Sequence, residues 1–178
     1  RFSERGFRML EVAVRDVVAP VTIHRVAVRD RRYPWPEAAP FSCSDPEITA
    51  IRSACVETLS CCSTDVFLDC PWRERALWTN DALVENRATL AAFGPTALHR
   101  HCIDLILGQC WESNGLFPGP CPGPPEGYND GSVLIPSNLY IWQILTDYVD
   151  FSGDFEPLRR HWDGLLRILE TFAGWSAG

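Results

Sequence analysis

The sequence contains no lysine, and its sixteen basic residues are all arginine. This absence indicates a compositional bias rather than a mechanism. No run of about eighteen apolar residues is present, which argues against a membrane-spanning helix. The chain carries 23 acidic residues and a formal net charge of −7. That balance argues against nucleic acid or an anionic membrane as the main partner.

No C-x-x-C pair and no signal peptide are found, although the sequence contains eight cysteines. A zinc-ribbon site is therefore not predicted. A chain of 178 residues with 46% hydrophobic residues can build a core without disulfide bonds. We predict free thiols, which together with the missing signal peptide favour a cytoplasmic location.

A second metal signal lies in a predicted helix, where His99, His101 and Cys102 are close in sequence. A histidine and a cysteine three residues apart on a helix are able to bind zinc, but no second pair of ligands follows. Exposed helix histidines are the favoured interpretation, and neither a metal nor a cofactor is predicted.

The densest group of reactive side chains lies between residues 69 and 81. This segment holds three carboxylates, two arginines and two tryptophans within thirteen residues. Pro71 predicts that its first half is a loop, and Asn80 reads as the N-cap of a following helix with Asp81 in the first turn. A carboxyl group can protonate the leaving oxygen of a sugar while aromatic rings cover the apolar face. The alternative is a solvated surface loop in which the Arg and Glu side chains simply pair.

This segment resembles the signature of the α-L-rhamnosidase family of glycoside hydrolases. The residues that carry the resemblance are Asp69-Cys70-Pro71, Arg73-Glu74, Trp78 and Asp81. The usual form reads Arg-Asp-Glu after Asp-Cys-Pro. This chain instead has Arg-Glu-Arg and one residue fewer between Asp69 and Asp81.

The resemblance implies that Glu74 is the general acid of an inverting reaction, with Asp69 and Asp81 as further catalytic residues. These two carboxylates are expected to raise the pKa of Glu74 by like-charge repulsion. Arg73 is expected to steady an acid or a sugar hydroxyl. The family's general base lies later in the toroid, no counterpart is identified here, and the chain is expected to be inactive alone. The other expected substrate-binding residues are Trp72, Trp78 and Asp130.

Residues 112–131 contain five prolines and five glycines and predict a long loop. So long a loop inside a compact domain is usually functional. It resembles the rhamnosidase segment that ends in an acid lining the sugar pocket, and Asp130 is the match. The alternative is a surface turn, because Asn-Asp-Gly is a strong turn signal.

Residues 1–33 are predicted to form strands, because residues 8–14 and 21–28 are rich in β-formers and Pro20 lies at a turn between them. They resemble the last strands of the β-sandwich that precedes the rhamnosidase catalytic domain. Residues 34–43 form a proline-containing linker. Residues 44–178 would then be the N-terminal part of the catalytic domain.

Helical periodicity and capping signals in this last segment predict five helices. One begins at a capping box of Ser44 and Glu47, one covers about 81–93, one starts at Pro95, one covers about 137–150, and one is capped by Asp154. The first helix has one apolar face formed by Ile48, Ile51, Cys55 and Leu59. The last is expected to bury a stripe formed by Phe155, Leu158, Trp162, Leu165, Leu166, Leu169 and Phe172.

The fold class is therefore predicted as mainly α, a partial (α/α)6 toroid preceded by a few β-strands. The resemblance implies inverting hydrolysis of terminal α-L-rhamnose from a rhamnoside substrate. Two alternatives stay open, a carbohydrate-binding protein without catalysis and another toroid enzyme of the glucosidase or debranching type. The oligomeric state is not predicted.

Overall fold

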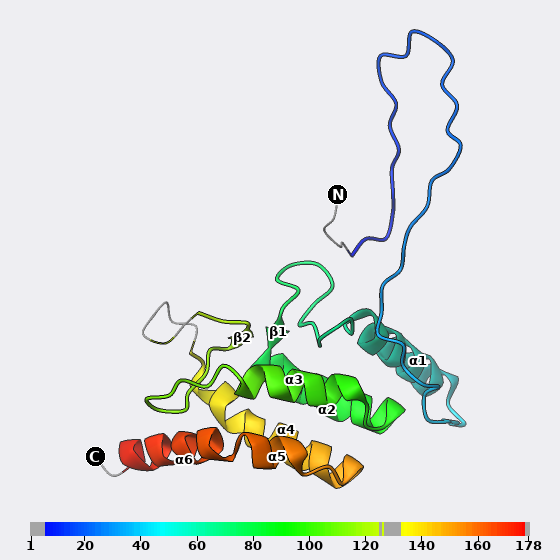
Figure 1. Cartoon of the computed structure of the whole chain (residues 1–178). Helices are drawn as coiled ribbons and strands as arrows, with labels where there is room; N and C mark the ends of the chain where they lie inside the picture. Colours follow the sequence, from blue (N-terminus) through cyan, green and yellow to red (C-terminus); the bar gives the residue numbers. More distant parts are fainter. Residues whose placement is uncertain (1–5, 125, 127–132, 177–178) are drawn as a thin grey trace.

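The computed structural model describes residues 6–124, 126 and 133–176 and is mainly helical, as predicted (Figure 1). The elements are α1 (Pro46–Cys61), β1 (Leu77–Trp78), α2 (Thr79–Phe93), α3 (Ala97–Leu107), β2 (Pro120–Cys121), α4 (Ile135–Ser152), α5 (Glu156–Arg160) and α6 (Trp162–Ser176). None of the helices in the described ranges is both long and apolar enough to cross a membrane.

Helix α1 begins one residue later than the predicted capping box implies. Its N-cap is Asp45 rather than Ser44, because the Asp45 carboxylate accepts the backbone N–H of Glu47 at 2.8 Å. Pro46 occupies the first turn as predicted. The predicted apolar face does not reach the core, since Ile48 and Ile51 are about half exposed and no residue of α1 is buried.

Helix α2 starts two residues earlier than predicted, with Trp78 rather than Asn80 at the N-cap. The reason is the short strand pairing of β1 with β2 that precedes the helix. Thr79 extends this pairing, since it donates both its backbone N–H and its hydroxyl to the carbonyl oxygen of Gly119, at 3.0 and 3.1 Å. This pairing carries the extended chain of β1 directly into the helix. The predicted end at Gly94 is confirmed, and the positive φ of 77° there is a conformation that glycine adopts at little cost.

The predicted last helix is two helices, because the chain breaks at His161 between α5 and α6. The side chains of Arg160 and His161 both bond the Asp104 carboxylate on α3 at 3.0 Å. The break interrupts the helical periodicity, so the predicted stripe is not continuous. Leu165 and Ile168 are fully buried, whereas four residues expected in the core are 37% exposed or more: Phe155, Trp162, Leu166 and Leu169.

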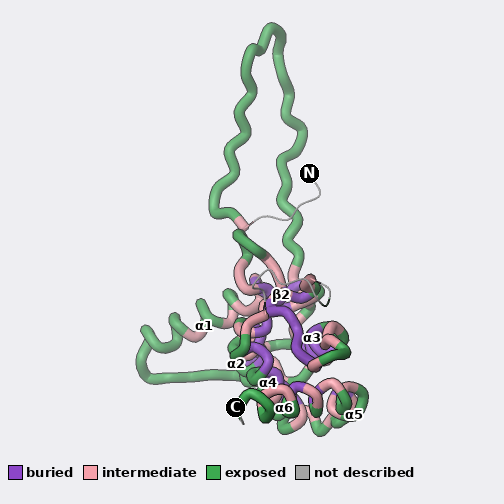
Figure 2. The backbone as a smooth tube through the Cα atoms, turned by 90° about the vertical axis from the view of Figure 1, so that its left-hand side faces the viewer, coloured by how far each residue is buried: buried purple, intermediate pink, exposed green. Residues whose placement is uncertain are grey.

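The core lies between α2, α3, α4 and α6, where buried segments meet (Figure 2). Two buried asparagines join its parts. Asn86 of α2 donates to the carbonyl oxygen of Ile144 on α4 at 3.4 Å. Asn138 of α4 accepts the N–H of Phe117 at 2.9 Å and donates to its carbonyl oxygen at 3.0 Å. The second pair fixes the glycine- and proline-rich loop against α4, because buried polar groups are costly to leave unpaired.

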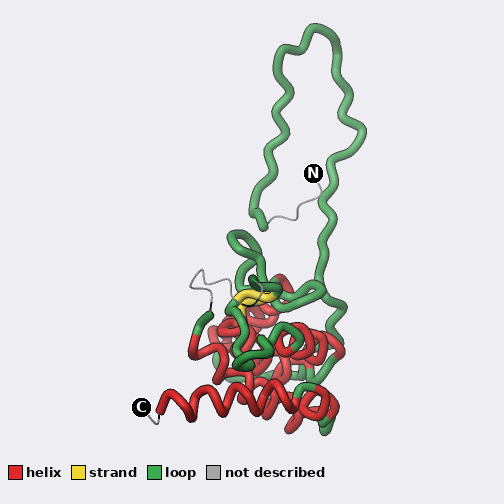
Figure 3. The backbone as a smooth tube through the Cα atoms, turned by 60° about the vertical axis from the view of Figure 1, so that its left-hand side comes forward, coloured by secondary structure: helices red, strands yellow, loops and turns green. Residues whose placement is uncertain are grey.

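The prediction of strands before the linker is wrong for the described residues 6–33. This segment contains no strand, and every residue from 7 to 31 is exposed. It forms a long excursion that projects away from the helices (Figures 1 and 3). High β-propensity alone does not make a strand, because a strand needs a hydrogen-bonded partner and a face to bury. The assignment of residues 1–33 to a sandwich domain stays a prediction.

The linker is fastened to the helical part by an aromatic stack and backbone hydrogen bonds. The ring of Trp35 stacks on Phe93 at the end of α2 with centroids 4.6 Å apart. The N–H of Tyr33, the residue just before the linker, bonds the carbonyl oxygen of Ser63 at 2.7 Å. The chain that leaves the excursion is thereby held against α2 and the loop that follows α1.

Candidate functional site

Residues 62–76, the motif loop, rise from the end of α1 and lead into β1 (Figure 1). The N–H of Leu68 bonds the carbonyl oxygen of Cys62 at 2.8 Å, which anchors the start of the loop. Two hydrogen bonds between Asp69 and Ala76, the last residue of the loop, then close it. The N–H of Asp69 bonds the carbonyl oxygen of Ala76 at 3.1 Å, and the Asp69 carboxylate accepts the N–H of Ala76 at 2.9 Å.

Glu74, the general acid predicted from the resemblance, is one of the residues of this loop, and its side chain is exposed to solvent. Arg73 Nε lies 2.6 Å from Glu74 Oε2, and the Cys70 thiol lies 3.6 Å from the same oxygen. The Arg73 guanidinium holds the pKa of Glu74 below its usual range. The expected rise in the pKa of Glu74 is therefore wrong for this structure, because the hydrogen bond from Arg73 is the largest influence on this carboxyl.

The repulsion expected at Glu74 acts instead on Asp81, in the first turn of α2. Burial raises the pKa of the Asp81 carboxyl, and the charges of Asp69 and Glu74 raise it further. Its neighbour Asn80 accepts the hydroxyl of Ser137 at 2.6 Å and so joins α2 to the start of α4. The structure thus brings the three motif carboxylates within electrostatic reach of one another.

The two tryptophans of the motif differ in exposure. Trp72 is 57% exposed on the motif loop, while Trp78 is half-buried in β1. Trp78 pairs with Pro120 of β2, so the glycine- and proline-rich loop lies directly beside the motif. The predicted pocket acid of that loop, Asp130, lies outside the described residues.

Asp69, Cys70 and Glu74 have ligand atoms within 4.8 Å of one another, which is close enough to share a metal ion. Hydrogen bonds and an ion pair already explain this proximity. Cys70 accepts the N–H of Arg73 at 3.3 Å and points its thiol at Glu74, whose carboxylate Arg73 neutralises. All eight cysteines are free thiols in the structure.

Sequence reasoning missed Glu85, which lies one helical turn after Asp81 on α2. Its side chain is half-buried, but one carboxyl oxygen is fully buried and has no hydrogen-bond partner among the described residues. Burial raises the pKa of Glu85 to about 9, and the charges of Asp81 and Asp69 add to the rise. The spacing of four residues from Asp81 is the signal that places both carboxyls on one face of the helix.

The interpretation of His99 as an exposed helix histidine is also wrong, because its side chain is fully buried. Its Nδ1 accepts the N–H of Thr96 at 3.1 Å, and its Nε2 lies 2.9 Å from the hydroxyl of Thr89. Burial lowers the pKa of His99 to about 4. His99 therefore caps α3 and ties it to α2, whereas His101 is exposed.

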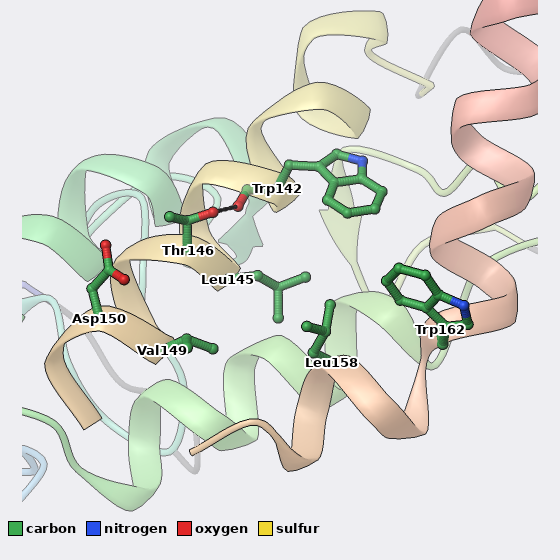
Figure 4. Close-up of a pocket in the computed structure, with 7 residues that line it drawn as sticks. All are labelled: Trp142, Leu145, Thr146, Val149, Asp150, Leu158 and Trp162. Carbon is green, nitrogen blue, oxygen red and sulfur yellow. Dashed lines mark hydrogen bonds between the residues drawn. The ribbon is translucent and has the colours of Figure 1, made fainter. Parts of the chain in front are cut away.

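A cavity of about 210 Å³ lies apart from the motif, between α4, α5 and α6 (Figure 4). Leu145 and Leu158 lie at its centre, and the rings of Trp142 and Trp162 flank it. Val149, Thr146 and Asp150 complete the lining. No motif residue lines it, so its apolar wall is separate from the carboxylates described above.

Helical hairpins that carry an acidic loop beside a short two-stranded ladder are the architecture of a helical-toroid glycosidase domain. A family model described as the bacterial alpha-L-rhamnosidase six-hairpin glycosidase domain matches residues 36–176. The chain belongs to this family, and the family resemblance read from residues 69–81 is confirmed. A comparison with curated protein sequences gives no match.

Solved rhamnosidase structures share the fold. A Klebsiella oxytoca rhamnosidase with rhamnose bound is 26% identical with a TM-score of 0.66, and the alignment covers 76% of this chain and 26% of that one. A rhamnosidase from Bacillus sp. GL1 is 24% identical with a TM-score of 0.69, covering 78% and 14%. The α-L-rhamnosidase of Dictyoglumus thermophilum is 22% identical with a TM-score of 0.63, covering 78% and 15%. The chain thus spans about a quarter or less of the length of these proteins.

Proposed function

We propose that the protein containing this chain hydrolyses terminal α-L-rhamnosides with inversion, and that this chain supplies the general acid, Glu74. The observation that carries the proposal is the closed motif loop, which gathers Asp69, Glu74 and the nearby Asp81 in a domain of the rhamnosidase family. The bound rhamnose of the Klebsiella oxytoca structure supports a sugar of this kind as the substrate.

The acid role requires Glu74 to hold a proton when the glycosidic bond breaks. In the structure Arg73 lowers the pKa of this carboxyl and so favours its ionised form. A sugar hydroxyl that accepts from the Arg73 guanidinium would draw this cation away from Glu74, and the sugar would also exclude water from the carboxyl. Both changes raise a carboxyl pKa, so substrate binding itself would prepare Glu74 for proton donation.

The remaining motif residues bind the sugar in this proposal. Asp69 and Asp81 accept hydrogen bonds from rhamnose hydroxyls, and Asp130 is assigned the same role from the family resemblance. Trp72 and Trp78 offer flat faces to the apolar side of the ring. An inverting reaction also needs a base roughly 6.5–9.5 Å from the acid to activate water, and we assign that base to none of the residues of this chain.

The test is Glu74→Gln in the full-length protein. Loss of proton donation should lower kcat by about 10²–10⁴-fold on an alkyl rhamnoside, and much less on a dinitrophenyl rhamnoside, whose leaving group needs little protonation. Glu170→Gln, an exposed residue of α6, is the matched control and should leave kcat unchanged. Near-normal turnover of the alkyl rhamnoside by Glu74→Gln would refute the acid assignment.

A second candidate is a carbohydrate-binding protein that does not hydrolyse its ligand. The observation in its favour is the exposed Glu74 with a lowered pKa, which is unsuited to proton donation as it stands. A panel of nitrophenyl glycosides, combined with calorimetric titration of rhamnose, separates the two. Binding without turnover of any glycoside would support the second candidate, and turnover of a glucoside in place of a rhamnoside would indicate another toroid glycosidase.

A further inference from the structure

Arg75, near the end of the motif loop, has a backbone conformation that residues with a side chain rarely adopt. Its φ angle is 54°, on the left-handed side of the φ/ψ map, where Cβ crowds the following carbonyl oxygen. Among the described residues, only Asp16 on the exposed excursion shares this property without being glycine. Aspartate has a short polar side chain that makes the conformation easier, and arginine does not. The surrounding loop therefore has to impose the conformation on Arg75.

Both neighbours of Arg75 are attached to one short segment of the same loop, residues 69 and 70. On one side, the Glu74 carboxylate lies 3.6 Å from the Cys70 thiol. On the other side, Ala76 makes two hydrogen bonds with Asp69, at 2.9 and 3.1 Å. Because Asp69 and Cys70 are consecutive, the two attachments meet at one place in the loop, and Arg75 is the only residue between them.

This arrangement gives the left-handed conformation a geometric role. Arg75 turns the chain so that the Glu74 carboxyl stays beside Cys70 while the next N–H still faces the Asp69 carboxylate. Relaxation to a negative φ would break one attachment or the other. The reactive atoms of Asp69, Cys70 and Glu74 all lie within 4.8 Å of one another as a result. Strained backbone held in place by its surroundings is typical of functional loops.

Packing does not hold the Glu74 carboxyl in this place. Glu74 is exposed, and the side chain of its ion-pair partner Arg73 is 81% exposed. An ion pair between solvated side chains restricts their rotamers only weakly. The direction of the carboxyl therefore depends on the backbone that carries Glu74, and the attachments on both sides of Arg75 fix that backbone.

We propose that Arg75 is a positioning residue for the general acid, because its left-handed backbone, rather than its guanidinium, directs the Glu74 carboxyl back across the motif loop toward Asp69. The conformation of Arg75 thereby sets the point at which Glu74 delivers its proton. This role in turnover rests on the proposed glycosidase function, whereas the role in closing the loop at Ala76 does not.

The experiment compares three variants of the full-length protein, all of which remove the arginine charge. Arg75→Gly and Arg75→Asn accept a positive φ, whereas Arg75→Val opposes it, because a β-branched residue is an outlier in that conformation. Asparagine and valine are similar in size, so a difference between these two variants reports the backbone. Asp16→Val makes the same kind of change at the left-handed residue of the excursion and serves as the control.

The first measurement is kcat on an alkyl rhamnoside and on a dinitrophenyl rhamnoside. Arg75→Val should lower kcat on the alkyl rhamnoside by about 10–10²-fold, because a small misplacement of a reacting group has effects of this size. Its kcat on the dinitrophenyl rhamnoside should change much less, since that leaving group needs little protonation. Arg75→Gly and Arg75→Asn should keep most of the wild-type kcat on both substrates, and Asp16→Val should match the wild type.

The second measurement is hydrogen exchange at the Ala76 amide, which needs no substrate. Exchange should be several-fold faster in Arg75→Val than in the wild type, because the hydrogen bond with the Asp69 carboxylate is weakened. It should stay slow in Arg75→Gly and Arg75→Asn. Should Arg75→Val not fold, Arg75→Ala takes its place, since its Cβ opposes a positive φ without adding a branch.

Wild-type turnover of the alkyl rhamnoside by Arg75→Val would overturn the proposal. Equal losses in all three variants would also overturn it, because they would assign the role to the guanidinium. A loss of the same size on both rhamnosides would overturn it as well, since it would indicate damage to the whole site rather than to proton donation. If the full-length protein hydrolyses no glycoside, the proposed function fails, and the exchange at Ala76 still decides whether the backbone of Arg75 closes the loop.

Discussion

The side chains of Arg73 and Glu74 are neighbours in sequence that form an ion pair, with Nε and Oε2 2.6 Å apart. The Arg73 side chain is 81% exposed, so this pair contributes little to folding, but it determines the protonation of the proposed general acid. A carboxyl held ionised by its own neighbour can donate a proton only after that neighbour has been moved or engaged elsewhere. The pair therefore links sugar binding to the readiness of the acid.

Replacing Arg73 by glutamine should raise the pKa of Glu74 toward the usual glutamate value, because the largest cause of its lowering is the hydrogen bond from Arg73. Carboxyl carbon NMR of the full-length protein, assigned by comparison with Glu74→Gln, measures this directly. The alkaline limb of the pH–rate profile should shift to higher pH in the free enzyme. Arg87→Gln is the control, since it removes an ion pair with Asp147 between α2 and α4, remote from the motif. An unchanged Glu74 titration in Arg73→Gln would contradict the pairing.

His99 should make the fold sensitive to acid. The folded state keeps this imidazole neutral down to about pH 4, whereas the unfolded chain protonates it near pH 6.5. The unfolded state binds more protons in that window, so stability should fall as pH drops through it, by on the order of 2–3 kcal/mol from this residue. Thermal melting from pH 7 to pH 4 measures the loss.

His99→Gln should show a flatter melting profile across the same window, because glutamine keeps hydrogen-bonding groups but does not titrate. Its melting temperature at pH 7 should be lower than that of the wild type, since the contacts with Thr89 and Thr96 are disturbed. His101→Gln removes an exposed imidazole from the same helix and should keep the wild-type profile. Equal profiles for wild type and His99→Gln would show that the buried imidazole is not the acid-sensitive group.

Much of the helical part follows from local signals. Gly94 and Gly153 end α2 and α4 with positive φ, as their residue type predicts. The break at His161 was not predictable, because it accompanies contacts with Asp104 on α3, which lies 57 residues earlier in the chain. The exposed excursion before the linker differs for the opposite reason: its residues favour strands, but strand formation requires partners that propensity does not supply.

The site was predictable in composition but not in electrostatics. The motif identified the acids at 69, 74 and 81, yet it did not indicate which carboxyl meets the arginine and which is repelled by its neighbours. In the structure Arg73 lowers the pKa of Glu74, whereas burial, followed by like-charge repulsion, raises the pKa of Asp81 and Glu85. The burial of Glu85 and His99 depends on how α2 and α3 pack, which helical spacing alone does not reveal.

Asp69 has two separable roles, closure of the motif loop and negative charge at the site. Its carboxylate accepts the N–H of Ala76 at 2.9 Å, an acceptor function that the amide oxygen of asparagine reproduces without the charge. Asp69→Asn should therefore keep the melting temperature within a degree or two, lower kcat/KM by about tenfold or more, and lower the pKa of Asp81 by removing a like charge.

Asp69→Ala removes both roles and should in addition destabilise the fold by about 1–2 kcal/mol, because the N–H of Ala76 loses its side-chain acceptor. Melting curves and kcat/KM of the two full-length variants, with Asp163→Asn on the exposed face of α6 as the control, distinguish the roles. If Asp69→Asn lowered the melting temperature as much as Asp69→Ala while keeping full kcat/KM, Asp69 would be a structural residue only. The charge that raises the pKa of Asp81 would then have no part in turnover.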